Sequence, residues 1–308
     1  MRQGPLREIN IGAGAAGFNF LPIFLAQHYG LFRQRGIAVT VKRTGSTDKA
    51  TAALGSGDLH IAITPPEGAI SSYANGGPLR IVGGNLNTLP LTLIANSRFK
   101  RPEDLRGASL GTSSLTEGTA IYTMEILAQH GLVYPGDYTF SLVGIHTARW
   151  EALKNGTLDA ALQLVPLNFV ALDQGFSNLG NADEYLPDLA FVSILVDGRW
   201  AAANHDALVD VLAAISEATE LMYDGSNDAS SLALANEHVQ TEEKYLRSSL
   251  NLLRNKMMMP RDLAIPVAAL ATSIRLMRRA GLLDGNTEKD PLGVIDDSFR
   301  LEALALAR

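Results

Sequence analysis

The chain has 308 residues, which is long for one compact core and suits two domains of about 100–200 residues each. Hydrophobic residues make up 46% and charged residues 19%, so a sizeable core can form and disorder throughout the chain is excluded. Cysteine is absent, which excludes disulfides, thiolate metal sites and cysteine nucleophiles. The formal charge is −6 and no block of Lys and Arg is present, so a nucleic-acid partner is not expected.

The N-terminal segment bears on localisation. Residues 1–10 include Arg2 and Arg7 but no apolar stretch typical of a secretory signal. No apolar run in the chain reaches the roughly 18–20 residues that a bilayer span requires. We expect a periplasmic protein if a signal peptide was removed from this sequence, and a cytoplasmic protein if Met1 is native.

The first two-thirds of the chain alternate short apolar strands with helical segments. Strands are predicted at residues 8–11, 37–41, 61–64, 79–83, 91–95, 109–111, 141–144, 159–164 and 191–196. Helices are predicted at residues 21–30, 48–55, 117–130 and 147–155. Strands that alternate with helices across short loops predict an α/β fold with mainly parallel sheets covered on both faces.

After Trp200 the pattern becomes helical only. Ala207, Val211, Ala214 and Ala218 recur at a spacing of three to four residues, as on an amphipathic helix. Further helices are predicted at residues 229–239, 242–255, 260–280 and 297–307, with Pro260 in the first turn of the third.

Gly12, Gly14 and Gly17 spell G-x-G-x-x-G after the first predicted strand, which is the fingerprint of a dinucleotide-binding loop. Two features argue against that function. The helix begins only near Pro22, beyond the glycines, and the second strand ends in Lys42 and Arg43 without an acidic partner for a ribose. The alternative is a loop that approaches a ligand or another backbone closely.

Several short motifs occur in a fixed order across residues 8–200. They are LPIFLA at 21–26, YGLF at 29–32, GIAV at 36–39, ALGSG at 53–57 followed by IA at 61–62, RPEDLRG at 101–107, GTSS at 111–114 with GT at 118–119, and AL at 152–153 with Gly156 and DA at 159–160. In their order and spacing, these motifs resemble the sulfonate-binding and thiamin-pyrimidine-synthase-like family of periplasmic binding proteins. Two features depart from the family pattern. His60 stands where an Asp is usual, and the 12–17 loop is unusually rich in glycine and alanine.

The resemblance implies a two-lobed type 2 periplasmic-binding-protein fold with a ligand cleft between lobes that close about a hinge. We expect residues 1–92 plus 193–308 to form lobe 1, with the C-terminal helices, and residues 93–192 to form lobe 2. The resemblance also implies a monomer that captures a small organic anion, such as a sulfonate, a carboxylate or a heteroaromatic acid. If the protein is exported, its partner would be the permease of an ABC importer.

The ligand should lie where strand C-termini meet, since open α/β sheets bind ligands there. Hydroxyl groups and backbone N–H groups at a helix N-terminus favour an anion, although Ser114 and Thr116 are equally suited to N-capping. Phe18 could equally be a core residue. The candidate ligand-binding residues are Gly17, Phe18, Asn19, Thr64, Pro65, Asn85, Asn87, Thr112, Ser113, Ser114, Thr116, His146 and Gln163.

An enzyme without a cofactor is the alternative, because the family's fold also carries decarboxylase-like enzymes and proteins of the thiamin-pyrimidine and menaquinone pathways. His60, Glu67 and His146 are then the candidate acids or bases. The absence of cysteine excludes the cysteine-dependent desulfinase chemistry found on this fold. No His spacing typical of a metal site is present, so we expect neither a metal nor a cofactor.

Overall fold

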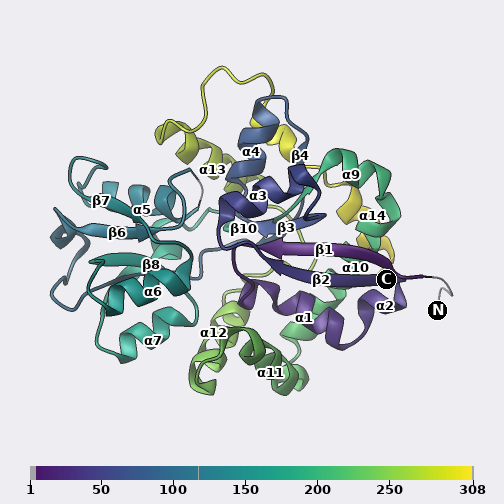
Figure 1. Cartoon of the computed structure of the whole chain (residues 1–308), viewed down its shortest axis with the longest axis horizontal. Helices are drawn as coiled ribbons and strands as arrows, with labels where there is room; N and C mark the ends of the chain where they lie inside the picture. Colours follow the sequence, from purple (N-terminus) through teal and green to yellow (C-terminus); the bar gives the residue numbers. More distant parts are fainter. Residues whose placement is uncertain (1–4, 117, 307–308) are drawn as a thin grey trace.

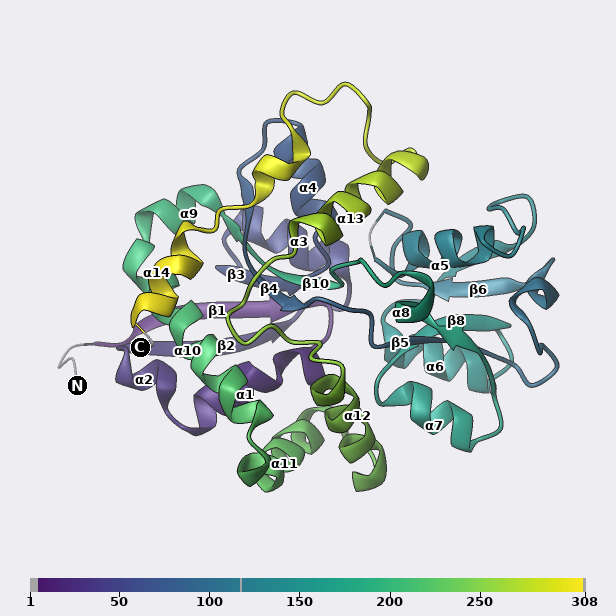
Figure 2. The ribbon, with the colours of Figure 1, turned by 180° about the vertical axis from the view of Figure 1, so that it is seen from behind.

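The computed structural model describes residues 5–116 and 118–306 and shows an α/β protein with two five-stranded sheets (Figures 1 and 2). The first sheet has the order β2-β1-β3-β10-β4 and the second has the order β7-β6-β8-β5-β9. We call the parts of the chain built on these sheets the first and the second lobe. In Figure 1 the second lobe lies on the left and the first lobe in the centre and on the right.

Strands of the first sheet are β1 (Arg7–Ala13), β2 (Ile37–Arg43), β3 (Ile61–Thr64), β4 (Leu79–Leu86) and β10 (Val192–Asp197). Strands of the second are β5 (Leu91–Ala95), β6 (Ser109–Thr112), β7 (Thr139–Leu142), β8 (Ala160–Leu164) and β9 (Ser177–Asn181). Two central strands, β3 (IAIT) and β5 (LTLIA), are buried along their whole length.

Each sheet is mixed, with four strands in one direction and one strand against them. β10 is antiparallel to β3 and β4, and β5 is antiparallel to β8 and β9, while the remaining pairs of neighbours are parallel. These two reversed strands follow the points where the chain changes sheet, between Leu86 and Leu91 and between Asn181 and Val192. The prediction of mainly parallel sheets is therefore correct for strand direction, while the residue-level domain boundaries stay a prediction.

Helices cover both faces of each sheet. In the first lobe α1 (Leu21–His28) packs against α10 (His205–Tyr223) on one face, while α3 and α4 contact β3 and β4 on the other (Figure 1). In the second lobe α6 and α7 lie across the sheet from α5. The α-helices of the first two-thirds are α1 (Leu21–His28), α2 (Leu31–Gln34), α3 (Thr47–Ser56), α4 (Glu67–Ala74), α5 (Thr119–Ala128), α6 (His146–Lys154), α7 (Leu167–Asp173), α8 (Ala182–Tyr185) and α9 (Gly198–Ala203).

Local sequence sets several of these helix ends. Ser46 caps α3 by accepting a hydrogen bond from the Lys49 backbone N–H, and Gly57 ends the helix in the left-handed region at φ 79°. Sequence analysis did not predict the short helices α2, α4, α7, α8 and α9 or strand β9. Short elements carry too few residues for a clear hydrophobic period.

The C-terminal third is helical, as predicted, and consists of α10 (His205–Tyr223), α11 (Asp228–Val239), α12 (Glu243–Asn255), α13 (Val267–Arg279) and α14 (Ser298–Leu306). The predicted helix start at Pro260 is wrong, because residues 260–266 form an irregular segment and α13 begins after Pro266. The predicted helix limits at Glu117 and Ala307 lie outside the described residues. No helix in the described part of the chain is both long and apolar enough to span a bilayer.

Side chains of two C-terminal helices contact the second lobe away from the first sheet. In α12, Lys244 pairs with Asp173 of α7 at 2.8 Å, and Lys256, directly after α12, pairs with Asp183 of α8. In α13, Arg279 pairs with Glu125 of α5 at 2.7 Å. The two lobes are therefore linked by surface ion pairs in addition to the crossing chain segments.

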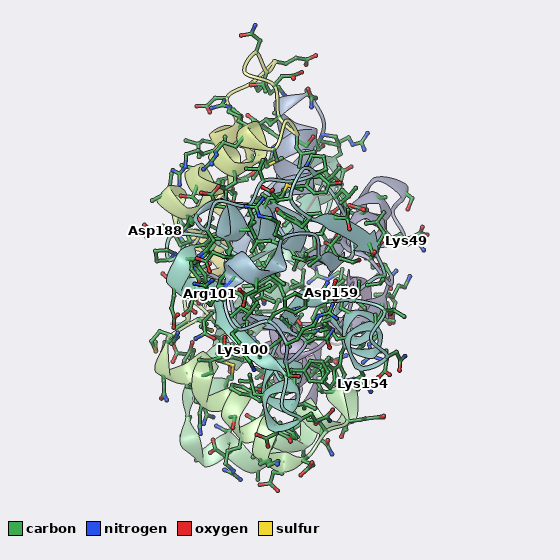
Figure 3. All side chains as sticks on the ribbon, turned by 90° about the vertical axis from the view of Figure 1, so that its left-hand side faces the viewer. Lys49, Lys100, Arg101, Lys154, Asp159 and Asp188 are labelled. Carbon is green, nitrogen blue, oxygen red and sulfur yellow. The ribbon has the colours of Figure 1, made fainter. Side chains whose placement is uncertain are left out.

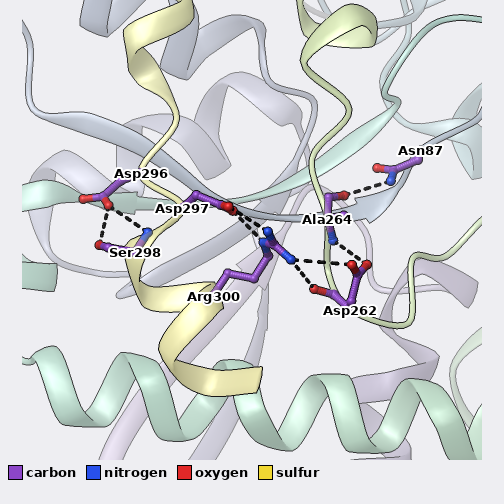
Figure 4. Close-up of polar contacts among 7 residues, drawn as sticks. All are labelled: Asn87, Asp262, Ala264, Asp296, Asp297, Ser298 and Arg300. Atoms are coloured by element: carbon purple, nitrogen blue, oxygen red, sulfur yellow. Dashed lines mark hydrogen bonds and ion pairs between the residues drawn. The ribbon is translucent and has the colours of Figure 1, made fainter. Parts of the chain in front are cut away.

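The segment before α13 is held by the last helix, α14 (Figure 4). The guanidinium of Arg300 donates to both carboxylate oxygens of Asp297, at 2.5 and 2.7 Å, and to the backbone carbonyl of Asp262 at 3.1 Å. The Asp262 carboxylate in turn accepts from the Ala264 backbone N–H at 3.0 Å. These contacts give the irregular segment a defined path along the first lobe.

The glycine-rich loop after β1 packs tightly against the start of α3. A Cβ on Gly14 would lie 2.9 Å from the carbonyl carbon of Ser46 and 3.2 Å from the nitrogen of Thr47, and both atoms are backbone. The helix after this loop, α1, begins at Leu21, beyond the glycines. This late start agrees with the prediction that the loop is not a dinucleotide site. Because Gly14 has no side chain, the backbone of this loop can pack closely against the backbone at the start of α3.

We expect Gly14→Ala to lower the free energy of unfolding by about 1–3 kcal/mol, because the backbone it would meet cannot move aside cheaply. Gly55→Ala is the matched control, since it lies within α3 and its Cβ would meet nothing within 4 Å. That change should leave stability unchanged or raise it by up to about 1 kcal/mol. Urea unfolding measures both. Equal effects of the two substitutions would contradict the packing argument.

Candidate functional site

A pocket lies between the two lobes and has a volume of about 80 Å³. The space is small, enough for several water molecules or a compact ligand. Its walls come from both lobes and from the two crossing segments. The lining residues are Ala13, Gly14, Ala15, Asn19, Thr47, Ile63, Thr64, Pro65, Leu91, Ser113, Gly118, Thr119, Ile145, His146, Arg149, Leu164, Phe191 and Val192.

The pocket lies at strand C-termini and helix N-termini. Strands β1, β3 and β6 end at it, as predicted for an open α/β sheet. The first residues of three helices also line it, namely Thr47 of α3, Thr119 of α5 and His146 of α6. Helix N-termini carry partial positive charge and unpaired N–H groups, so this end of the fold attracts an anion.

Arg149 is a buried cation on the wall of this pocket. Its side chain is 4% exposed, and burial lowers its pKa to about 10. One guanidinium nitrogen, Nη1, donates to the Gly144 carbonyl at 3.3 Å, and Nε is buried without a partner among the described residues. No described Asp or Glu lines the pocket or pairs with Arg149. A buried charge without a counter-ion costs free energy, and a bound anion would remove that cost.

His146 lies one helical turn before Arg149, on the same face of α6. Desolvation, and to a lesser extent the neighbouring Arg149, lowers the pKa of His146 to about 3. The imidazole is therefore neutral at physiological pH and offers one donor and one acceptor to the pocket. The positive charge of the site comes from Arg149 and the helix ends.

Gln163 of β8 supports the start of α6 through hydrogen bonds to its backbone. It is fully buried on β8, and in the amide orientation that satisfies both atoms it bonds two backbone groups of α6. Its nitrogen donates to the His146 carbonyl and its oxygen accepts from the Trp150 N–H, each at 3.1 Å. We predicted Gln163 as a ligand contact, and its position instead makes it a support for the helix that carries His146 and Arg149.

Five of the predicted ligand-binding residues line the pocket: Asn19, Thr64, Pro65, Ser113 and His146. Thr64 is 2% exposed, and its hydroxyl has no partner among the described residues. The hydroxyl of Thr47, which sequence analysis did not select, also lines the pocket and is buried without a partner among the described residues. Both hydroxyls and Arg149 Nε are therefore available to a ligand.

Four other predicted residues lie behind the pocket wall. Asn19 Oδ1 accepts from the Gly17 N–H at 3.1 Å, and the Asn19 carbonyl accepts from Asn85 Nδ2 at 3.1 Å, so Gly17 and Asn85 shape this loop. Thr112 Oγ1 donates to the Ser114 carbonyl at 2.9 Å within the β6–α5 loop. Phe18 is 2% exposed and belongs to the hydrophobic core, which was the alternative given for it.

Three more predicted residues point elsewhere. Asn87 Nδ2 donates to the Ala264 carbonyl at 2.9 Å, so it fixes the segment before α13 (Figure 4). Ser114 Oγ donates to Asp48 of α3 at 3.0 Å and accepts from the Thr116 N–H at 3.0 Å. Ser114 thus joins the two lobes beside the pocket, and Thr116 is exposed next to it.

Of the three candidate acids or bases, only His146 lines the pocket. The His60 ring stacks on Trp200 at 5.1 Å and accepts from the Asn10 N–H at 3.1 Å, at the opposite end of β3. Glu67 is buried at the start of α4 and contacts the second lobe. Across the described residues, no three His, Asp or Glu side chains gather in a way that could hold a metal ion.

Sequence analysis missed Arg149, although one signal pointed to it. A cation in the first turn of a helix opposes the helix dipole, and Arg149 falls in the first turn of the helix predicted at 147–155. A residue that breaks a local rule in this way is often functional. The burial of Arg149, which distinguishes it from an ordinary surface arginine, depends on tertiary packing and could not be predicted from the sequence.

Two α/β lobes joined by two crossing segments around a pocket define the periplasmic-binding-protein class of folds. Residues 17–229 match the family model described as NMT1/THI5 like, and the chain belongs to this family. The match begins directly before α1 and spans every strand of the two sheets except β1, together with α10.

Relatives include binding proteins and enzymes. The nitrate-binding protein NrtA from Synechocystis PCC 6803 superposes with a TM-score of 0.83 at 13% identity, over 98% of this chain and 89% of that one. The alkanesulfonate-binding protein SsuA from Xanthomonas axonopodis superposes at 0.78 with 18% identity, over 96% and 100%. A 4-amino-5-hydroxymethyl-2-methylpyrimidine phosphate synthase from Schizosaccharomyces pombe is 30% identical over 159 residues, 50% of this chain and 44% of its own length.

The lowered pKa of His146 predicts a loss of stability in acid. Because the folded state favours the neutral ring, its contribution is complete above the ordinary pKa of about 6.5 and is lost as the pH falls toward about 3. We expect His146→Gln to reduce the fall in unfolding free energy over this range, as measured by urea unfolding at successive pH values. An unchanged pH dependence in the variant would contradict this prediction.

Proposed function

We propose that the protein captures a small organic anion in the cleft between its lobes and presents it to an ABC importer. The observation that carries this proposal is Arg149, a buried cation without a described counter-ion, set among the N-termini of α3, α5 and α6. An anion bound there would satisfy the guanidinium, the helix ends and the free hydroxyls of Thr47 and Thr64 together.

The pocket chemistry favours a monoanion with a compact apolar body. One full positive charge is present, since His146 is neutral at physiological pH. The remaining wall is largely apolar, with Leu91, Leu164 and Phe191 beside the charged end. A carboxylate or sulfonate bound to Arg149 matches this division, and a heteroaromatic acid would place its ring against the apolar wall.

The relatives support transport as the purpose of binding. SsuA and NrtA are named as alkanesulfonate-binding and nitrate-binding proteins, and both ligand types are anions. We infer that an exported protein of this kind works in the periplasm as a monomer, with hinge closure around the ligand as the signal to a permease.

An enzyme is the second candidate function. The curated relatives are named as pyrimidine phosphate synthases, and His146, a potential base, faces the pocket. Incubation of the protein with each bound acid would test this function. Chemical conversion that His146→Ala abolishes would favour the enzyme, while unchanged ligand recovered after many hours would favour the binding protein.

We expect Arg149→Met to weaken anion binding by at least about 30-fold, because truncating one partner of a buried charge pair costs about 2 kcal/mol or more. The ligand-free variant should be as stable as the wild type or more stable, since an uncompensated buried charge is removed. Thermal shift with methanesulfonate, taurine, acetate and benzoate is the measurement. A ligand at about 100 times its Kd should add about 2.7 kcal/mol of stability.

Arg33→Gln is the control for this experiment, because Arg33 is exposed on α2 and lies away from the pocket. It should leave every thermal shift unchanged. If no acid in the panel stabilises the wild type, or if Arg149→Met binds as well as the wild type, the proposed anion site is wrong.

A further inference from the structure

We propose that closure of the cleft takes up one proton on the carboxyl group of Glu67, so that acid favours the closed, ligand-holding state. The proposal deepens the proposed function, since it rests on lobes that close around a ligand. Glu67 lies outside the pocket lining, so it would act on closure and not through contact with the ligand.

Glu67 joins the two lobes directly. It is the first residue of α4 in the first lobe, and its Oε1 accepts a hydrogen bond of 2.8 Å from the Tyr122 hydroxyl of α5 in the second lobe. Tyr122 is itself fully buried. The contact is therefore enclosed when the lobes are together, and any opening that separates α4 from α5 breaks it.

The closed arrangement hides Glu67 from water. The side chain is 1% exposed, and its second oxygen, Oε2, is buried without a hydrogen-bond partner among the described residues. An ionised carboxylate with one oxygen unsatisfied is costly in such a place, whereas a neutral carboxyl is not. Burial raises the pKa of Glu67 to about 7, against weaker opposing hydrogen bonds from its own backbone, Tyr122 and Gly118.

Three charged groups on the elements packed against α4 make contacts away from Glu67. On β4, Arg80 lies over the Tyr73 ring near the far end of α4; on α3, Asp48 accepts from Ser114. On α13, Arg279 pairs with Glu125 of α5. The other charged groups on these neighbours are Lys49 of α3, Arg275 and Arg278 of α13, and Asp290 beside the short helix at Pro291–Val294. Glu67 forms no ion pair with any described residue.

The direction of the pH effect follows from the two states. In the open state Glu67 meets water and has its ordinary pKa of about 4.5, and in the closed state its pKa is about 7. The stabilisation of closure is complete below the open-state value and is lost as the pH rises through the closed-state value. Above that range both states are ionised and closure no longer depends on this group.

The chain has no cysteine, so two introduced cysteines can carry a pair of fluorophores without interference. Lys49 of the first lobe and Lys154 of the second are both exposed at the surface (Figure 3). Single-molecule energy transfer in the Lys49→Cys/Lys154→Cys protein reports the ratio of closed to open molecules without ligand. The measurement is made in the His146→Gln background, because opening the cleft would hydrate the His146 ring, whose titration would then oppose that of Glu67. We expect the ratio in this background to fall at least about tenfold between about pH 5 and pH 7.

In the same background, Glu67→Gln keeps the size of the side chain and removes the titratable proton, so the ratio should not change with pH over the same range. Glu8→Gln, the same change at an exposed position of β1, should leave the pH dependence of the His146→Gln protein unchanged. Tyr122→Phe should lower the closed fraction at every pH by removing the donor. A ratio that is constant with pH in the His146→Gln protein, or a dependence that survives when Glu67→Gln is added to it, would overturn the proposal.

A second measurement separates this proposal from the proposed function. Calorimetric titration with methanesulfonate, in buffers of different ionisation enthalpy near pH 6, counts protons taken up on binding. In the His146→Gln background we expect uptake approaching one proton when Glu67 is present and none when it is replaced by Gln. Binding without proton uptake would refute the role of Glu67 in closure and leave the anion site unaffected. Absence of binding would count against the anion site, while the fluorescence experiment would still test the role of Glu67.

Discussion

The two reversed strands, β5 and β10, determine how the rest of the molecule is arranged. Each is hydrogen-bonded inside one sheet and is connected by a short segment to the other, so the lobes meet along these segments. The remaining strands point their C-terminal ends at the junction, and the following helices start there. The pocket, its lining from both lobes and the contact between Glu67 and Tyr122 all follow from this arrangement.

The electrostatics of the cleft follow from the same geometry. Helix N-termini meet where strands end, and Arg149 adds a full charge that no described carboxylate offsets. A folded protein usually avoids such an arrangement because it costs stability. Its presence here is understandable if an anion completes it, and the neutral state of His146 leaves Arg149 as the charged contact.

The fold was largely predictable because its signals are local. Apolar runs such as residues 61–64 and 91–95 gave strands with the observed limits, and the resemblance supplied their arrangement. The pocket was only partly predictable. The positions of Thr64 and His146 at the pocket could be predicted because each lies where a strand ends. The direction of the Ser114 side chain, toward a ligand or toward Asp48, depends on how the two lobes meet. Likewise, only the packing of the second lobe decides whether Gln163 faces the cleft or the backbone of a helix. Arg149 required knowledge of its burial.

The position of β10 has a consequence for how the chain is made. This strand lies between β3 and β4, and within the described residues those two strands share no ladder with each other. As the chain leaves the ribosome, β4 has no sheet partner until β10, more than a hundred residues later, has emerged. By then every strand of the second sheet has been synthesised. The second lobe can therefore assemble first, and the first lobe, although it begins the chain, completes its sheet last.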